Sequence, residues 1–474
     1  MESLRTLAIP VALFGKFADG GRRQENHLQE NHLKASGSSG SKDKMTGSQT
    51  TLKRIEFNEN IVAMLAFAVL LVAVVFLADR PPINERTDFS VTYIGSRMVY
   101  LGLGPKLYDL AEQQKLKRVL LPDAEPLIYE HPPFEALLLA PLGALPYKTA
   151  YLIWGLINVA IWLMLTYLLR PYAPAPRDDL GYLALWLLFA PLGVALFEGQ
   201  SSLLLVLLYV IAFIQLRSGR DFRAGAILGL ALFKFQFVVP LAVIFLLQRK
   251  WRFMKGFLTI GTALGVLSLV AVGWHGIISY IHLLVGIATH PDNSSYGAAI
   301  GTATIQGFVH ALLGGVLGHA AVSVIVAGVS IFLIVWTAGR WRKADLAADR
   351  RTFDRRNFDL MFAAAIVVSL VTGFHMFTYD LSPLMLAMLL VAGHFPGRSQ
   401  ALLRLILGTT LVMFWIPPLY LALLAWHCVY LWFPVLMAFM IGTLKLAESP
   451  AEVVPSTDIG DPAVRLAGIP YHGK

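Results

Sequence analysis

Long stretches of uncharged apolar residues recur along this chain, and they constrain its fold more than any other feature. A helix needs about 20 such residues to cross the roughly 30 Å hydrocarbon core of a bilayer. Hydrophobic residues make up 56% of the 474 positions and charged residues only 15%, whereas soluble domains average about 25% charged residues. A β-barrel would show alternating segments of about ten residues instead. The sequence therefore predicts an all-α polytopic membrane protein and excludes an ordinary soluble or disordered chain.

The charged residues fit the same interpretation. The formal net charge is +9, which in a soluble protein would suggest a nucleic-acid partner. Here the basic residues lie mostly in short loops between apolar stretches, as the positive-inside rule requires, so we expect membrane lipids and no nucleic acid as partners. The single cysteine, Cys428, lies in an apolar stretch. It excludes a disulfide framework and a multi-cysteine metal site, and we expect no metal.

Three regions are expected along the chain. Residues 1–54 are polar and contain a tandem repeat (24–28 and 29–33) and a Gly/Ser stretch at 36–41, which predicts a disordered cytoplasmic tail. Met45 is an alternative start within it. Residues 55–445 form the membrane domain, with 79–133 as its first outer loop. The Pro-rich residues 446–474 are expected to be a second cytoplasmic tail.

Loop charges predict the topology. Lys53 and Arg54 precede the first span at 61–78, which places the N-terminus in the cytoplasm. We expect roughly 10–13 spans, a second outer loop at 275–302, an interfacial helix within 303–318 and a cytoplasmic C-terminus, in the plasma membrane. The other predicted spans are 150–169, 180–197, 201–216, 256–274, 320–337, 360–373, 381–391, 405–421 and 424–444.

Residues 224–247 cannot be one ordinary span, because basic residues flank both ends of this apolar stretch. We expect a hairpin of two short helices whose ends are both cytoplasmic. Its tip is Phe233-Lys234-Phe235-Gln236. Broken helices are tolerated at membrane depth where they line a polar cavity, and a charged residue there is a functional candidate.

Polar residues gather at the predicted outer ends of the spans. Each has a structural interpretation: Asp88 as a helix N-cap, Lys234 as a snorkelling side chain, and His375 as an interface histidine. Together, a carboxylate, a lysine and a histidine describe a cavity that could bind an anionic head group and deprotonate an alcohol. Further substrate-binding candidates on that face are Arg97, Gln200, Gln236, Tyr379 and Asp380.

Motifs of soluble enzymes are absent from the sequence, including Walker A, G-x-G-x-x-G, H-E-x-x-H and G-x-S-x-G. Nucleotide-driven chemistry is therefore unsupported. Two other interpretations stay open, a transporter or flippase for a glycolipid and a scaffold without catalysis. A transporter would show an internal repeat of spans and polar residues near the midplane, which we do not find. A scaffold leaves Asp88 beside Arg97 and the charged hairpin unexplained.

Several segments taken together resemble a known family. They are "TDFSVTYIGSRMVYLGLGPKLYD", "YEHPPFEALLLAPLGALPYKTAYLIW", "FEGQSSLLLVLLYV", "RAGAILGLALFKFQFVVP" and "FHMFTYDLSPL". The set resembles glycosyltransferase family 87, the α-1,2-mannosyltransferase-like enzymes that use polyprenyl-phosphate mannose, over about residues 55–445. The resemblance implies a GT-C bundle with short interfacial helices and a cavity open to the periplasm or cell exterior.

The resemblance also implies a chemistry and site residues. The donor would be a polyprenyl-phosphate sugar, commonly of mannose, which is a substrate rather than a cofactor, and no cofactor or metal is expected. The acceptor, a glycan, lipid or protein, cannot be deduced. An acidic residue of the first outer loop would be the general base, which maps to Asp88, while Lys234 and His375 would hold the donor phosphate. One base suffices for inversion, in contrast to the carboxylate pair of a retaining hydrolase.

Two neighbouring carboxylates compete with Asp88 for the role of base. Asp109 follows a Gly-Pro segment and opens an apparent helix, which is typical of a cap or turn residue. Glu85 lacks the aromatic partner that Phe89 provides to Asp88. We therefore expect Asp88 to be the base.

Overall fold

The computed structural model describes residues 68–173, 179–289, 301–347 and 354–449. Within these ranges the chain forms helices joined by turns, and no strand is present. The all-α prediction is thus confirmed. The predicted disordered tail 1–54 and residues 450–474 of the predicted C-terminal tail lie outside the described residues, while helix α21 continues past 445 to Glu448.

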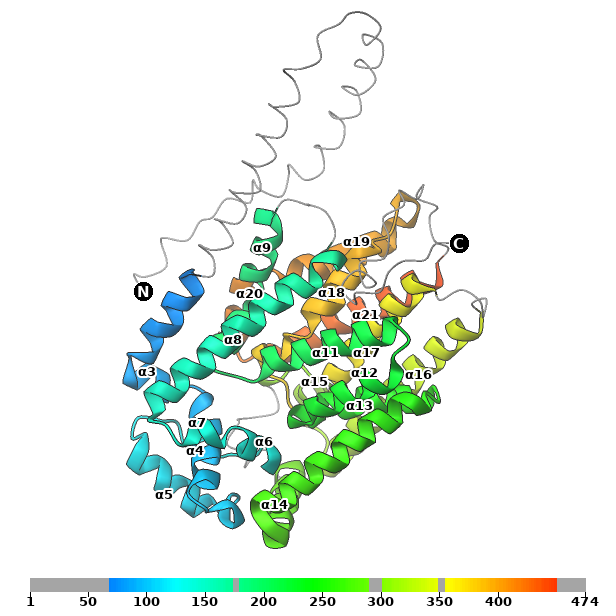
Figure 1. Cartoon of the computed structure of the whole chain (residues 1–474). Coiled ribbons are helices and arrows are strands. Elements are labelled where there is room, and N and C mark those ends of the chain that lie inside the picture. The colour runs from blue at the N-terminus through cyan, green and yellow to red at the C-terminus, as the bar shows by residue number, and fades with distance from the viewer. Residues whose placement is uncertain (1–67, 174–178, 290–300, 348–353, 450–474) are drawn as a thin grey trace, which may run out of the picture. The chain divides into compact units, whose positions relative to one another are not determined.

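The helices follow one another in the order shown in Figure 1. After the helix Ala68–Ala78, the first half contains α3 (Pro81–Glu85), α4 (Phe89–Tyr100), η3 (Gly104–Lys106), α5 (Leu110–Leu120), α6 (Pro133–Leu138), α7 (Ala140–Gly143), α8 (Tyr147–Leu169), η4 (Arg170–Tyr172), α9 (Asp179–Leu188), α10 (Ala190–Phe197) and α11 (Ser202–Arg217). The second half contains α12 (Asp221–Leu230), η5 (Ala231–Lys234), α13 (Phe235–Leu247), α14 (Trp251–Thr289), α15 (Ile305–Leu313), α16 (His319–Ala347), α17 (Arg355–Val371), η8 (Thr378–Leu381), α18 (Leu384–Gly393), η9 (Arg398–Gln400), α19 (Ala401–Phe414), α20 (Pro417–Ala425), η10 (Val429–Leu431) and α21 (Trp432–Glu448).

Several of these helices can cross a membrane. By length and composition, five helical stretches in the described part qualify, 221–247 among them, or six if the bent pair α19 and α20 counts as one span, and three shorter apolar helices accompany them. Large apolar side chains on α14 and α16 stay exposed, among them Val270 and Ile331, which suits a surface in contact with lipid. The chain is a polytopic membrane protein.

Residues 221–247 fold back on themselves, as the charges at both ends predict. By length and composition alone they pass for one span. In a straight helix, residue 225 would lie about 33 Å from residue 247. The six residues from 247 to 253 are too short to bring residue 253 back over that distance to residue 225. Yet Gly225 lies against the backbone of Phe253, and Gly256 against that of Phe222. Helices α12 and α14 therefore run side by side in the same direction, and α13, which connects them in sequence, returns the chain to the end where α12 began (Figure 1).

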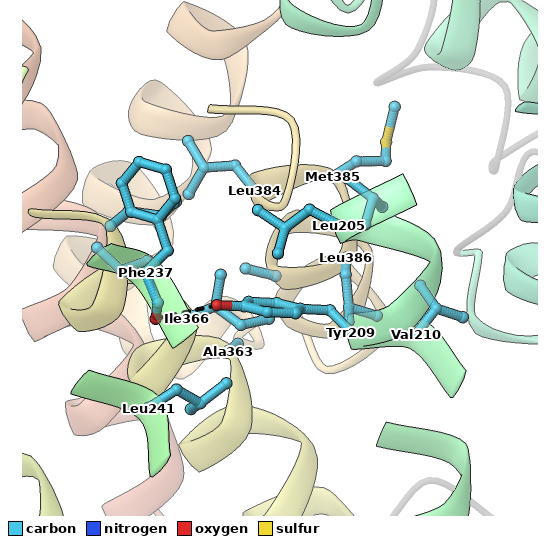
Figure 2. Close-up of a cluster of buried hydrophobic side chains, with 14 of the residues drawn as sticks. Leu205, Tyr209, Val210, Phe237, Leu241, Ala363, Ile366, Leu384, Met385 and Leu386 are labelled. Carbon is cyan, nitrogen blue, oxygen red and sulfur yellow. Dashed lines mark hydrogen bonds between the residues drawn. The ribbon is translucent and has the colours of Figure 1, made fainter. Parts of the chain in front are cut away.

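The hairpin packs closely into the bundle just beyond Lys234. Figure 2 shows the Tyr209 ring of α11 among apolar side chains of α13, α17 and α18. Its hydroxyl donates a hydrogen bond of 3.1 Å to the carbonyl oxygen of Phe237, the third residue of α13. Both residues are fully buried. This contact fixes the depth of the hairpin tip relative to α11.

Two predicted loops contain more helix than expected. The segment 79–133 forms α3, α4, η3, α5 and the start of α6. Its apolar residues, among them Phe89, Met98 and Leu107, pack in one cluster with residues of α8 and α14. Residues 275–289, predicted as loop, continue α14 beyond a kink at Gly273, where φ is 68°. Glycine adopts this φ without the steric penalty of a side chain. There the helix turns, and Tyr280 stacks on Tyr108 at 4.7 Å between ring centroids.

Two predicted spans are broken. Residues 180–197 divide into α9 and α10 at Phe189, which has extended backbone angles before Pro191 at the start of α10. Residues 405–421 bend by 73° between α19 and α20. The break precedes Pro417, the first residue of α20, because a residue before proline is disfavoured in helical geometry. Apolar length alone did not reveal these breaks.

Candidate functional site

A chain of hydrogen bonds joins four polar residues that are far apart in the sequence. The Gln200 amide nitrogen donates to Asp88 Oδ2 at 2.7 Å, and Lys234 Nζ donates to Gln200 Oε1 at 3.3 Å. Lys234 Nζ also pairs with Asp380 Oδ1 at 2.5 Å. The three predicted groups at Asp88, the Gln200 turn and the hairpin tip thus meet with Asp380. We call this set the Asp88–Asp380 chain.

Asp88 stands at the N-cap of α4 but does not cap it with its side chain. Its carboxylate instead faces Gln200, while its backbone N–H donates to Glu198 Oε2 at 3.1 Å. The next residue, Phe89, is 1% exposed and its ring stacks near Trp154 at 6.5 Å. The buried Phe89 thus fixes the position of the adjacent Asp88, which itself stays partly exposed.

The turn that carries Gln200 is held by helix α8. Trp154 Nε1 donates to the carbonyl oxygen of Gly199 at 2.7 Å, and the Tyr151 hydroxyl donates to that of Phe197 at 2.8 Å. Gly199 has a φ of 62°, and a Cβ there would lie 2.8 Å from Cβ of Phe89. Only glycine fits this position without displacing Phe89.

Lys234 is enclosed rather than snorkelling. It is 3% exposed and Asp380 is 1% exposed, and Nζ lies 5.0 Å from the centre of the Tyr379 ring. The Asp380 carboxylate also accepts hydrogen bonds from the Phe377 backbone N–H at 3.1 Å and the Ser202 hydroxyl at 3.4 Å. An ammonium group has three N–H donors, and the two hydrogen bonds described here leave a third for a ligand.

A small cavity of about 30 Å³ adjoins the Asp88–Asp380 chain, enough for about one water molecule. Its polar lining includes Gln200, Lys234, Gln236, His375 and Tyr379, all candidates from the sequence. Asp380, also a candidate from the sequence, lines the cavity as well, together with Glu130 and His131. Four segments distant in sequence therefore converge on one space.

Burial shifts the pKa values of two ionisable groups that line the cavity, His375 and Glu130. Burial, with the neighbouring cations Lys234 and His131, lowers the pKa of His375 to about 4. The His375 ring is thus neutral at pH 7 and donates one hydrogen bond. Burial raises the pKa of Glu130 to about 7, and the charge of Asp88 adds to this rise. His375 Nε2 lies 3.9 Å from Glu130 Oε1.

The remaining sequence candidates lie elsewhere or have other partners. Arg97 donates to the carbonyl oxygen of Gly143 at 2.8 Å, so it ties α4 to α7. Asp109 caps α5 by accepting from the backbone N–H groups of Ala111 and Glu112, as the Gly-Pro context predicts. Glu85 accepts from the backbone N–H of Asp123. Asp109 and Glu85 thus bond to backbone N–H groups and are not members of the Asp88–Asp380 chain.

Glu130, His131 and Glu198 were missed as individual site residues. Glu130 and His131 belong to the motif Tyr129-Glu130-His131-Pro132-Pro133, in which polar residues directly precede two prolines. Burial lowers the pKa of His131, but the Glu135 carboxylate, 2.5 Å from its Nδ1, raises that pKa above its usual value. The sequence could have indicated Glu130 and His131 as site residues, because both are ionisable and stand in an otherwise apolar segment.

The fold and the site define a polytopic membrane protein with an ionisable, largely buried centre at one end of its helices. The sequence model of glycosyltransferase family 87 matches residues 129–372, which is more than half of the chain. The chain belongs to glycosyltransferase family 87 and is a membrane glycosyltransferase. Glu130, Gln200 and Lys234 lie within the matched residues, whereas Asp88 and His375 lie outside them. No curated protein and no solved structure matches the chain.

Proposed function

We propose that this glycosyltransferase moves a sugar, with mannose as the first candidate, from a polyprenyl-phosphate donor to a hydroxyl group of a glycan or lipid acceptor. The observation that carries the proposal is the Asp88–Asp380 chain, which links a partly exposed carboxylate to a buried cation beside a cavity. A carboxylate serves as the base and a cation as the partner of a phosphate.

The proposed reaction is a single inverting displacement. Asp88 takes the proton of the acceptor hydroxyl as its oxygen forms a bond to C1 of the sugar. The bond between C1 and the phosphate oxygen breaks, and its electron pair leaves with polyprenyl phosphate. The third N–H of Lys234 and the N–H of neutral His375 stabilise the charge that develops there. The cavity of about 30 Å³ is smaller than a hexose, so donor binding requires its lining segments to move apart.

We further propose that the site faces the periplasm or cell exterior, with both termini in the cytoplasm of a cell bounded by this plasma membrane. Basic residues support this orientation. Arg217 pairs with Asp359 at the end of α11 far from Gln200, and Arg356 binds the C-terminal end of α21. Arg249 and Lys250 lie in the turn after the hairpin. The positive-inside rule assigns that end to the cytoplasm. Cysteines placed at 220 and 252 test this orientation: both should be labelled from the cytoplasmic side.

The decisive experiment is turnover of the purified protein with a panel of radiolabelled polyprenyl-phosphate sugars. Asp88→Asn should lower transfer by roughly 10²–10⁴-fold, the usual range for loss of a general base, while donor binding stays nearly intact. Asp109→Asn is the matched control, because it alters only the cap of α5. Near-normal turnover by Asp88→Asn, together with loss in Asp109→Asn or Glu85→Gln, would refute the assignment. Failure of every polyprenyl-phosphate sugar would refute the donor class.

A further inference from the structure

Glu130 is an ionisable residue of the cavity for which the proposed reaction has no role. It precedes α6, lines the cavity and is 8% exposed. Its Oε2 atom is buried and has no hydrogen-bond partner among the described residues. A buried carboxylate oxygen without a partner is costly, so a ligand that pairs with it would relieve this cost.

The charges around Glu130 disfavour a second anion unless a proton is added. Lys234 is neutralised by Asp380, and His131 is paired with Glu135. The charge of Asp88 raises the pKa of Glu130, and an ionised Glu130 adds a second negative charge. A donor phosphate would bring a third, and like charges close together in a buried site disfavour ionisation. The titratable groups that face Glu130 from the surrounding elements are His131, Glu135, Asp88, Lys234, His375, Asp380 and Tyr280.

Glu130 lines the cavity and can take the proton near neutral pH. Burial raises its pKa to about 7, so half of its carboxyl groups are already protonated at that pH. Burial lowers the pKa of His375 to about 4, which keeps the histidine from taking the proton. An approaching phosphate raises the pKa of Glu130 further, because like charges disfavour ionisation.

We propose that the cavity binds its donor phosphate together with one proton from solvent, and that Glu130 holds this proton as a neutral hydrogen-bond donor to the phosphate. The proposal rests on the proposed polyprenyl-phosphate donor and deepens it. A protonated carboxyl group has one O–H to donate, whereas the ionised form only accepts. Glu130 would thus join Lys234 and His375 as the third donor to the same phosphate, without adding a charge that repels it.

Calorimetric titration of the full chain in lipid nanodiscs tests the proposal. The probe is the methyl ester of a polyprenyl phosphate, a phosphodiester that keeps one negative charge between pH 5 and 9. Proton uptake follows from the binding heat in buffers of different ionisation enthalpy. We expect an uptake of nearly one proton per probe at pH 8 and clearly less at pH 6. The dissociation constant should rise about tenfold per pH unit above pH 7.

Two variants sharpen the experiment. Glu130→Gln keeps an N–H donor but cannot titrate, so it should bind the probe with no proton uptake and a dissociation constant independent of pH between 6 and 8. Glu85→Gln is the matched control, since Glu85 bonds to Asp123 outside the cavity, and it should take up protons as the unmodified chain does. The measurement on the unmodified chain stands even if Glu130→Gln fails to fold.

The outcomes separate the two proposals. Binding of the probe without proton uptake at pH 8 refutes the role of Glu130 and leaves the donor class intact. Proton uptake that persists in a folded Glu130→Gln variant assigns the proton to another group and also refutes it. Absence of binding by the unmodified chain at every pH refutes the phosphate donor itself, and this inference with it.

Discussion

Removal of one partner from the buried pair of Lys234 and Asp380 should destabilise the protein more than removal of both. The two charged atoms lie 2.5 Å apart, and both residues are at most 3% exposed. With an effective dielectric constant of about 20, their attraction is about 7 kcal/mol. Part of this only offsets the cost of taking both charges out of water, and loss of one partner from a buried pair typically costs about 3–5 kcal/mol.

We therefore expect Asp380→Asn or Lys234→Met to lower the free energy of unfolding by about 3–5 kcal/mol each. The double variant, in which Lys234→Met is combined with Asp380→Asn, should regain most of this loss because no unpaired charge remains and the asparagine oxygen still accepts a hydrogen bond. It should nevertheless be inactive, since the cation proposed to hold the phosphate is gone. This combination separates a structural pair from a functional one.

The assay is unfolding in mixed micelles of increasing SDS content, followed through the fluorescence of the 10 tryptophans. The surface pair of Lys106 and Glu112, 3.2 Å apart and partly exposed, is the matched control, and Glu112→Gln should cost about 0–1 kcal/mol. Additive losses in the double variant would show that the two charges are not coupled. Retained transferase activity in a stable double variant would remove Lys234 from phosphate binding.

Variants at three other positions test the site and the packing of the hairpin that carries Lys234. Gln200→Leu removes the amide between Asp88 and Lys234. Loss of a hydrogen bond to a charged group costs about 1.5–3 kcal/mol, so kcat/KM should fall by about 10–150-fold, and unchanged kinetics would contradict this. Burial lowers the pKa of His375 to about 4, so His375→Gln should retain more activity than His375→Ala, and neither should alter the pH profile between 5 and 8; a lost limb in that range would show that the histidine titrates there. Gly225→Val cannot fit against α14 and should destabilise the bundle by at least about 1–3 kcal/mol, measured in the same SDS titration; wild-type stability would contradict the close helix contact.

Loop charges in the sequence were sufficient to predict the hairpin. Basic residues on both sides of 224–247 require both ends at one membrane face, and the contact between Gly225 and Phe253 confirms that the two ends lie together. The break before Pro417 was missed, because the apolar stretch continues through it and hydropathy does not register a bend. Charge thus predicts the ends of helices better than apolar length predicts their continuity.

The candidate site was predicted only in part, because the sequence does not show which polar side chains contact one another. Gln200, Lys234 and Asp380 were identified because polar residues in apolar surroundings are conspicuous, and the structure joins them. Arg97 was equally conspicuous but is bound to the carbonyl oxygen of Gly143. Glu130 was read only as part of a motif. Which polar side chain finds a partner depends on contacts between distant segments, and a single sequence carries no record of those contacts.

The pairing of Lys234 with Asp380 can form only after a delay during synthesis of the chain. The two residues are 146 positions apart. At a translation rate of about 5–20 residues per second, the ribosome needs about 7–30 s to reach the aspartate after the lysine has left the peptidyl-transferase centre. Asp88 and Gln200 are made before Lys234, so the Asp88–Asp380 chain cannot be completed until Asp380 is made. During that interval the nascent hairpin carries a cation without its counter-ion, because Lys234, which directly precedes α13, is made well before Asp380.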